Sequence, residues 1–393
     1  MKSIRNLSIF VLLAGFVFSC TPRHNVEAHI KEIGDDTIII EYMTMSDLFV
    51  SDEPGRDTVY AVNGSFFYDI DYDEPIVVMF FPLKGAVEMH SRQLHPGGKK
   101  LELFIKPRDN IYVEGELKDL YLDYYAEGSA INEEFSRLRR DYVEEVSEAV
   151  LIEFKIDSLI AEGAPREMIN EYFSKRSEVW EIRRKKQMEY ILENPGSELS
   201  AYLLLRQPLD TLNKYYQHLE GDIREGIFKP GLEKRLTDFR KRTMAEEARE
   251  VVTEGAEAPG FILESIEGKQ VSLADVGSDF IVLHFWGSWC GPCLQGLPRM
   301  KEYYEKYSDI VEFVSVACND QNERWRETVE EHGTDIWMQL FNDDDIERDV
   351  SVMYGVEAYP TKFILDADRT IIGRFRGEGD DFYQKVDELF KTD

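Results

Sequence analysis

The sequence predicts a multi-domain chain with an antiparallel β-rich domain, a helical middle region and a C-terminal α/β domain. Three observations lead to this prediction. Short apolar runs separated by turn residues fill roughly the first 120 positions, and apolar residues at helical spacing follow up to about position 250. Beyond that point strand-like and helix-like patterns alternate, which is typical of an α/β fold. The length of 393 residues, less a leader segment, fits two or three domains.

Residues 1–19 are predicted to be a signal peptide. Lys2 and Arg5 precede an apolar run over residues 7–18, which as a helix would reach only about 18 Å, short of a roughly 30 Å hydrocarbon core. Cys20 follows a small residue and resembles the lipidated cysteine of a lipoprotein signal, so we expect a lipid anchor. An ordinary signal peptide with an incidental cysteine is the alternative. Export would place the chain in the cell envelope, facing the periplasm, where disulfides persist.

Residues 20–120 are predicted to form an antiparallel sandwich or partial barrel, and residues 121–250 a helical connector. Apolar runs between Gly, Pro, Asn and Asp indicate strands at Thr37–Tyr42, Ile76–Phe81, Leu101–Ile105 and Ile111–Val113. In the connector, apolar residues recur at three- and four-residue steps, as at Ile169, Phe173, Trp180, Met188 and Ile191. The β-rich region shows no catalytic constellation, and we expect the helices to space and orient the last domain.

Composition excludes one broad class of partner. The 76 Asp and Glu against 46 Lys and Arg give a formal net charge of −30, which opposes binding to the phosphate backbone of a nucleic acid. The same charge disfavours lying flat on anionic lipid, so any membrane tether should be covalent. Four cysteines in 393 residues are too few for a disulfide framework.

One stretch of the chain carries recognisable chemistry, the pentapeptide Trp-Cys-Gly-Pro-Cys at residues 289–293. The apolar run over residues 280–286 predicts a buried central strand before it, and a helical pattern follows from Cys293 to Tyr307. The two cysteines therefore sit where a strand turns into the first turn of a helix. Unpaired N–H groups and the helix dipole stabilise a thiolate at such a place. A thiolate attacks disulfides, and the second cysteine can then attack the mixed disulfide.

This segment resembles the thioredoxin-like superfamily and, within it, the membrane-tethered TlpA/ResA-like thiol–disulfide oxidoreductases. Gly291 and Pro292 match the thioredoxin dipeptide, and Pro298 matches the proline that kinks the active-site helix. Residues 354–361, Tyr-Gly-Val-Glu-Ala-Tyr-Pro-Thr, match a signature whose proline is cis, and residues 255–261 resemble the opening of TlpA and peroxiredoxin domains. The resemblance implies a thioredoxin-like fold for residues 251–393. The β-rich region resembles a domain of unknown function that often precedes TlpA-like domains in secreted lipoproteins.

The elements of the last domain follow from the same patterns. We expect a hairpin over residues 261–273, the central strand over 280–286 and the active-site helix over 293–307. A strand over residues 311–317 and a helix over 323–331 should follow. Residues 335–352 form an extra segment that short thioredoxins lack and TlpA-like proteins carry. Residues 361–365 and 370–375 are expected to form a second hairpin, and residues 380–390 a closing helix.

The resemblance and the placement of the cysteines imply roles for the site residues. Cys290, more exposed at the helix start, should react first, and Cys293 should resolve the mixed disulfide. A cis Pro360 would place the Tyr359 backbone beside the sulfurs, where an extended substrate could pair as an added strand. Trp289 is expected to shape a functional surface beside the dithiol, plain packing being the alternative. No metal and no cofactor other than the redox-active disulfide is expected.

The sequence departs from the family pattern at two positions. Thioredoxins carry a buried aspartate six residues before the first cysteine, where His284 stands here, and ResA-like proteins often carry a glutamate at the position of Gly296. His284 could take over proton transfer, since imidazole titrates near neutrality. The alternative, which we favour, is a neutral core histidine bonded to a backbone carbonyl. Glu357, close to Pro360, is a second candidate acid.

Together these inferences predict an extracytoplasmic, membrane-anchored oxidoreductase that takes electrons from a membrane thiol donor and reduces disulfides of secreted proteins. The Gly-Pro dipeptide resembles that of thioredoxin, with a potential of about −270 mV, rather than the oxidant DsbA at about −120 mV. Apocytochrome c reduction is a task of TlpA/ResA-like proteins that no residue here specifies. The alternatives are a disulfide oxidase or isomerase, and a non-catalytic scaffold or partner-binding lipoprotein.

Two further activities are disfavoured by particular residues. Peroxiredoxins need a threonine or serine three residues before the reactive cysteine, and Gly287 holds that position. A zinc site would need ligands beyond the two cysteines, and only Cys318 and seven scattered histidines are available. Cys318 is expected to be a semi-buried structural thiol, with a third redox cysteine as the alternative.

Overall fold

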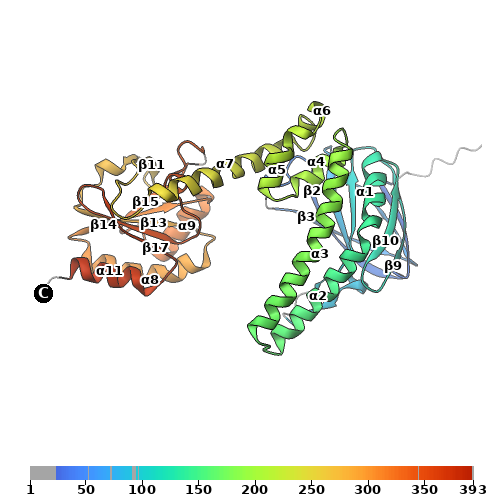
Figure 1. Cartoon of the computed structure of the whole chain (residues 1–393), viewed down its shortest axis with the longest axis horizontal. Helices are drawn as coiled ribbons and strands as arrows, with labels where there is room; N and C mark the ends of the chain where they lie inside the picture. Colours follow the sequence, from blue (N-terminus) through green and yellow to red (C-terminus); the bar gives the residue numbers. More distant parts are fainter. Residues whose placement is uncertain are drawn as a thin grey trace, which may run out of the picture. The chain divides into compact units, whose positions relative to one another are not determined.

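A computed structural model describes residues 24–51, 53–70, 73–90, 94–95, 97–343 and 345–391 (Figure 1). The predicted signal peptide and Cys20 lie outside the described residues. The chain divides into two compact units, Met1–Leu232 and Glu233–Asp393. Within the described ranges, no helix combines the length and the apolar character needed to cross a bilayer.

The N-terminal unit is built on two four-stranded sheets, ordered β10-β9-β1-β4 and β3-β2-β5-β8. Alternate residues of both sheets, such as Ile38, Ile40 and Val113, point into one shared core, as expected of a sandwich. The antiparallel β-rich prediction is confirmed, although β1 pairs with β9 in parallel. The strands are β1 (Val26–Lys31), β2 (Asp36–Thr44), β3 (Gly55–Ala61), β4 (Ser65–Tyr68), β5 (Ile76–Pro82), β6 (Val87–Glu88), β7 (Leu94–His95), β8 (Leu101–Ile105), β9 (Ile111–Leu117) and β10 (Leu122–Glu127).

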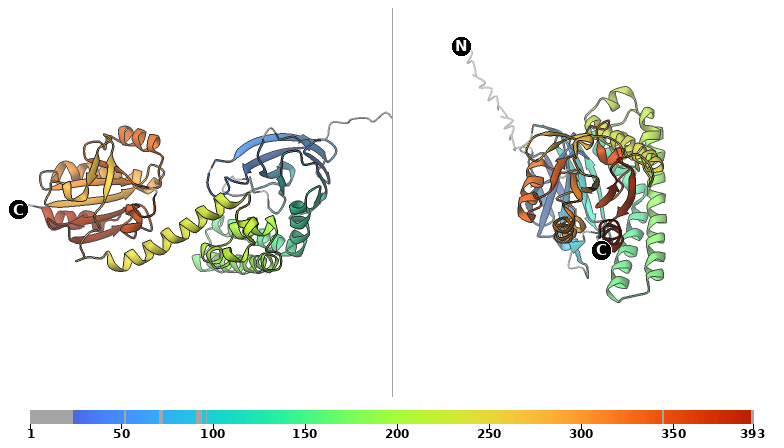
Figure 2. Two further views of the ribbon diagram at one scale, coloured as in Figure 1. Left: turned by 90° about the horizontal axis from the view of Figure 1, so that it is seen from above. Right: turned by 90° about the vertical axis from the view of Figure 1, so that its left-hand side faces the viewer.

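Helices of the same unit cover the outer face of β8. All five residues of this strand are buried, because one face lies in the sandwich and Phe104, on the other face, contacts Phe135 and Tyr202 with ring centroids 5.4 and 4.7 Å apart. The two longest helices of the unit, α2 and α3, run side by side (Figures 1 and 2). The helices are α1 (Ala130–Asp141), α2 (Val143–Ala161), α3 (Arg166–Glu193), α4 (Glu198–Leu205), α5 (Leu209–Tyr215) and α6 (Gly221–Arg224), with α7 (Lys229–Val251) leading into the second unit.

The C-terminal unit contains a seven-stranded mixed sheet, ordered β12-β11-β15-β14-β13-β16-β17. Strands β13, β14 and β15 are parallel, and β16 and β17 continue the sheet in antiparallel pairs. The predicted thioredoxin-like fold is confirmed, and the extra segment over residues 335–352 supplies β15 and all but the last residue of α10. The strands are β11 (Ile262–Ser265), β12 (Gln270–Ser272), β13 (Phe280–Trp286), β14 (Val311–Ala317), β15 (Met338–Phe341), β16 (Thr361–Leu365) and β17 (Ile371–Arg376).

The alternation of side chains along β13 separates two cores in this unit. Ile281, Leu283 and Phe285 belong to one core, whereas Val282 and Trp286 belong to the other, together with buried residues of α8, α9 and α11. Figure 1 shows α8 and α11 along the same side of the sheet. The side chain of His284 therefore lies on the face that the active-site helix covers. The helices are α8 (Gly291–Tyr307), α9 (Asn322–His332), α10 (Val350–Met353) and α11 (Asp380–Phe390).

The last turns of α7 pack against the loop that precedes Pro360. Gly355 has φ +59°, and a Cβ there would come within 2.9 Å of the Ala245 carbonyl oxygen and 2.8 Å of the Arg249 nitrogen. Glycine is thus required both by its left-handed conformation and by the approach of the helix backbone. An ion pair of 2.7 Å between Lys241 Nζ and Asp349 Oδ2 fixes the same helix to the segment that leads to the site.

Candidate functional site

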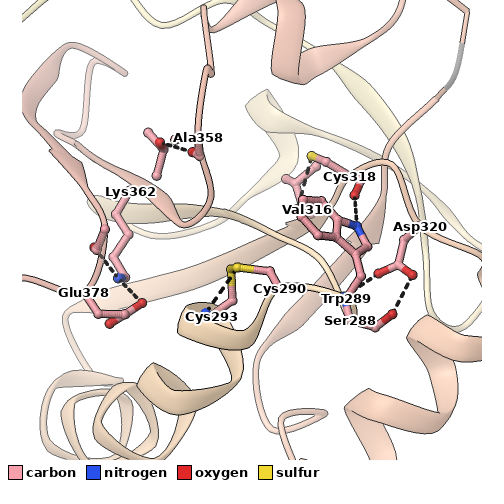
Figure 3. The surroundings of a disulfide bond; sticks show 12 residues. Ser288, Trp289, Cys290, Cys293, Val316, Cys318, Asp320, Ala358, Lys362 and Glu378 are labelled. Atoms are coloured by element: carbon pink, nitrogen blue, oxygen red, sulfur yellow. Dashed lines mark hydrogen bonds and ion pairs between the residues drawn. A yellow bond between two sulfur atoms is a disulfide. The ribbon is translucent and has the colours of Figure 1, made fainter. Parts of the chain in front are cut away.

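The two cysteines of the pentapeptide form a disulfide at the N-terminus of α8 (Figure 3). The sulfurs are 2.05 Å apart and the Cα atoms 5.2 Å apart. Cys290 is the N-cap residue, and its sulfur accepts a hydrogen bond of 3.2 Å from the Cys293 backbone N–H. Gly291 and Pro292 open the helix, where the missing N–H of proline removes no intrahelical bond. The backbone thus directs a donor and the positive end of a helix at Cys290, which stabilises a thiolate there.

Exposure differs between the two cysteines and their neighbours. Cys290 is 4% exposed and Cys293 is fully buried, whereas Trp289, Gly291 and Pro292 are exposed. In the disulfide form the remaining access to the sulfur pair is therefore through Cys290. This order of access agrees with Cys290 as the residue that meets an incoming disulfide first.

The loop before Cys290 is held by Asp320, which follows β14. The Ser288 backbone N–H and hydroxyl donate hydrogen bonds of 2.5 and 2.6 Å to the two carboxylate oxygens of Asp320. The Trp289 indole N–H donates a bond of 3.1 Å to the Cys318 carbonyl oxygen, so the exposed ring has a fixed orientation (Figure 3). Ser288 and Asp320 were not identified from the sequence, because their pairing depends on the adjacent ends of two parallel strands.

The Tyr359–Pro360 peptide bond is cis, as predicted. The Tyr359 ring lies edge-on to Trp289, with centroids 5.4 Å apart, and this contact brings the loop before β16 next to the residue that precedes Cys290. Cys318 is fully buried rather than semi-buried, it forms no disulfide, and its thiol donates a hydrogen bond of 3.5 Å to the Val316 carbonyl oxygen. Burial raises the pKa of its thiol well above the ordinary value, so Cys318 remains protonated and unreactive near neutrality.

His284 is completely buried in β13 and hydrogen-bonds through Nδ1 to the Ser315 hydroxyl, 3.2 Å away. The favoured expectation named a backbone carbonyl as the partner, and the partner is instead a hydroxyl, which also accepts a bond of 2.9 Å from the Trp337 indole. Burial, and secondarily the charge of Lys362, lower the pKa of His284 well below its ordinary value. The imidazole is therefore neutral near pH 7 and a poor proton acceptor.

A buried ion pair that sequence reasoning missed lies on the other side of the disulfide from Trp289 (Figure 3). Lys362 Nζ, with no exposed side-chain surface, is 2.6 Å from a Glu378 carboxylate oxygen, and Glu378 is 18% exposed. Lys362 is the register partner of His284 across β13 and β16. A lysine inside the apolar run Thr361–Leu365 was the available signal, since a cation in a central strand needs a buried partner.

Glu357, the second candidate acid, faces cations instead of the sulfurs. It forms ion pairs with Arg249 of α7 and, at 3.8 Å, with Arg376 of β17. Its carboxylate is thus engaged in holding the loop before Pro360. Among the residues that the structure describes, no cluster of three or more His, Cys, Asp or Glu is arranged to bind a metal ion.

The C-terminal part of the chain is similar to known thiol–disulfide oxidoreductases. The model of the AhpC/TSA family matches residues 255–374. The thiol-disulfide oxidoreductase ResA of Bacillus thuringiensis is 31% identical over 125 residues, which are 32% of this chain and 70% of that protein. ResA of Bacillus subtilis is 30% identical over 125 residues, covering 32% of this chain and 68% of the relative. Among solved structures, the thioredoxin domain of a thiol-disulfide oxidoreductase from Bacteroides vulgatus matches this chain with 25% sequence identity and a TM-score of 0.33. The match covers 35% of this chain and 98% of that domain.

Proposed function

Since this chain belongs, through its C-terminal domain, to the ResA-like thiol–disulfide oxidoreductases, we propose that it reduces disulfides of exported proteins by exchange at Cys290 and Cys293. The chain is a protein thiol–disulfide oxidoreductase. The observation that supports the assignment of the site is the bonded cysteine pair at the start of α8, with an N–H directed at the Cys290 sulfur. The proposal concerns the direction of exchange, the roles of the residues and the place of action.

The reaction proceeds in two exchanges from the reduced protein. The Cys290 thiolate attacks one sulfur of the substrate disulfide, forming a mixed disulfide and releasing the other substrate sulfur as a thiolate that takes up a proton. Cys293 then loses its proton and attacks the Cys290 sulfur, so that the Cys290–Cys293 bond forms and the second substrate thiolate leaves. Two electrons pass from the dithiol to the substrate, and a membrane thiol donor restores the dithiol.

Substrate binding is assigned to the surface between Trp289 and Tyr359. The exposed indole of Trp289 is fixed by its hydrogen bond to the Cys318 carbonyl, and it meets Tyr359 edge-on beside the disulfide. An extended substrate segment would pair with the Tyr359 backbone as an added strand, which recognises main-chain groups and tolerates many sequences. Such recognition suits a reductase with more than one client, and apocytochrome c is one client to test.

A reductase is supported over a peroxidase by the environment of Gly287. A Cβ at this position would overlap the Trp289 indole, so the threonine or serine that peroxiredoxins place there does not fit without moving Trp289. Asp320 also holds the loop that contains Gly287 and Trp289 in place, through its two hydrogen bonds to Ser288. This environment supports the proposal that a polypeptide disulfide binds beside the aromatic surface.

Action outside the cytoplasm on a lipid anchor is supported by Lys2, Arg5, the apolar run over residues 7–18 and Cys20. A Cys20→Ser variant tests the anchor. We expect the parent protein, and not the variant, to incorporate labelled palmitate and to sediment with membranes. Equal membrane association of the two proteins would contradict a lipid anchor at Cys20.

The direction of exchange is tested by equilibrating the protein with glutathione buffers and by following insulin reduction. We expect a potential near about −270 mV, as for thioredoxin, and insulin reduction that Cys290→Ser abolishes. A Cys293→Ser variant should trap mixed disulfides with exported proteins. A potential near about −120 mV would instead assign an oxidase, and the absence of both turnover and trapped partners would favour a scaffold.

A further inference from the structure

Neither of the two positions at which related proteins carry a carboxylate supplies a proton acceptor for Cys293. His284 is neutral and buried, with Nδ1 on the Ser315 hydroxyl, and position 296, one turn after Cys293, is a glycine. The space that a side chain at residue 296 would occupy is nevertheless taken by a carboxyl group from another segment. A Cβ added at Gly296 would overlap the carboxyl group of Glu378, which reaches α8 from the loop between β17 and α11.

This contact places the Glu378 carboxyl close to the resolving cysteine. Side chains three residues apart lie on one face of a helix, with Cβ atoms about 5–6 Å apart, and each Cα–Cβ bond tilts toward the helix N-terminus. A group that occupies the Cβ position of residue 296 therefore lies beside Cys293, on the buried side of α8. Cys293 is fully buried, so a proton leaving its thiol needs an acceptor within the protein.

Lys362 and Tyr383 hold the carboxyl group of Glu378 in place. The Lys362 ammonium lies 2.6 Å from one of its carboxylate oxygens and forms an ion pair with it. The Tyr383 hydroxyl donates a bond of 3.2 Å to the other carboxylate oxygen. Replacing a buried ion pair by well-packed apolar residues is often neutral for stability, so stability alone does not require this pair.

The other ionisable groups around the pair leave Glu378 as the acceptor. Arg299 of α8 is engaged by Asp380 at 2.5 Å, and Asp381 of α11 acts on Lys362 at longer range. Burial raises the pKa of the Tyr383 hydroxyl, so it remains a donor near neutrality. The neutral His284 faces Lys362 from β13 and is disfavoured as an acceptor by the same positive charge.

We propose that Glu378, paired with Lys362, takes the proton from the Cys293 thiol when Cys293 resolves the mixed disulfide. In this step the S–H bond of Cys293 breaks and its proton passes to a Glu378 oxygen. The sulfur electron pair forms the bond to Cys290, the bond between Cys290 and the substrate sulfur breaks, and the substrate thiolate leaves. In the reverse direction Glu378 returns the proton to Cys293. This assignment rests on the proposed exchange at Cys290 and Cys293.

The experiment separates the two exchanges in the full-length reduced protein. With an excess of 5,5′-dithiobis(2-nitrobenzoate) in stopped flow, the first release of coloured thiolate reports attack by Cys290, and the second reports resolution by Cys293. In a Glu378→Gln variant we expect the first phase within twofold of the parent. The second phase should be at least tenfold slower at pH 7, in line with the contribution of a general base, and should recover as the pH rises and the thiol ionises unaided. Glu388→Gln, an exposed charge removal on α11, is the matched control and should change neither phase.

A second variant makes the test independent of the stability of the first. Lys362→Met removes the cation that pairs with Glu378, and it should slow the second phase at pH 7 while leaving the first phase within twofold of the parent. The proposal is overturned if Glu378→Gln resolves at the parental rate across the pH range. It is equally overturned if both phases slow together with no recovery at high pH, which would indicate a structural role. Loss of the first phase in the parent protein would instead refute the proposed exchange at Cys290.

Discussion

Replacing Gly296 by alanine should destabilise the C-terminal unit, although alanine is the better helix former. Within a helix the change from glycine to alanine favours folding by about 0.8–1 kcal/mol. At this position, however, the added Cβ occupies the space of the Glu378 carboxyl. Glu378 would have to turn outward, which leaves the Lys362 ammonium buried with no counter-charge and only the Gly377 carbonyl oxygen, 3.4 Å away, as a partner.

The expected magnitude follows from these opposing effects. Separating a buried ion pair by losing one partner costs about 3–5 kcal/mol, and the partial exposure of Glu378 places this case near the lower end. After the gain in helix propensity, the free energy of unfolding should fall by about 2 kcal/mol. For a unit of this size that corresponds to a decrease in melting temperature of about 4–8 °C.

Tryptophan fluorescence during urea or thermal unfolding is a suitable assay. Four of the five tryptophans, at positions 286, 289, 325 and 337, belong to the C-terminal unit, so the signal reports this unit even if the two units unfold separately. Gly291→Ala in the same helix is the matched control, because a Cβ there meets nothing within 4 Å. If Gly296→Ala is as stable as this control or more stable, the close approach of Glu378 to α8 is refuted.

Three further predictions concern other buried groups. The His284→Ala variant should resolve mixed disulfides within about threefold of the parental rate at pH 7, because the neutral imidazole of His284 is a poor proton acceptor. A decrease in rate comparable to that of Glu378→Gln would instead assign proton transfer to His284. In the folded oxidised protein Cys318 should resist iodoacetamide at pH 8 and react only after unfolding, because burial raises the pKa of its thiol; labelling at the rate of a free thiol would contradict this. Burial opposes ionisation of Glu102, but Arg206 and Lys100 hold its pKa at about 2, below the unfolded value of about 4.3. This carboxylate should therefore stabilise the N-terminal unit above about pH 4.3 and lose that effect as the pH falls toward 2. In a Glu102→Gln variant, unfolding followed by circular dichroism should show lower stability at neutral pH and a smaller loss of stability between about pH 4.3 and 2 than in the parent.

The sequence predicted the parts of the site that depend on neighbouring residues. The strand over residues 280–286 and the cysteines at the start of α8 follow from local periodicity and short spacings, whereas the cis proline was implied by the resemblance of residues 354–361 to a family signature. The structure has each of them at the expected place. Strands β2, β5 and β8 were predictable for the same reason. The parallel pairing of β1 with β9 was not, because the two strands are far apart in the chain and no local pattern specifies which edges meet.

The sequence by itself therefore determined the chemistry of this protein, a dithiol at a helix N-terminus, because nucleophile, resolving group and helix start lie within one turn of chain. Only the tertiary structure decided what surrounds the buried sulfur. Strand register sets Lys362 opposite His284, and the loop before α11 brings Glu378 onto Gly296. Burial lowers the pKa values of His284 and Lys362, and it depends on contacts between segments that the spacing of residues along the chain does not encode.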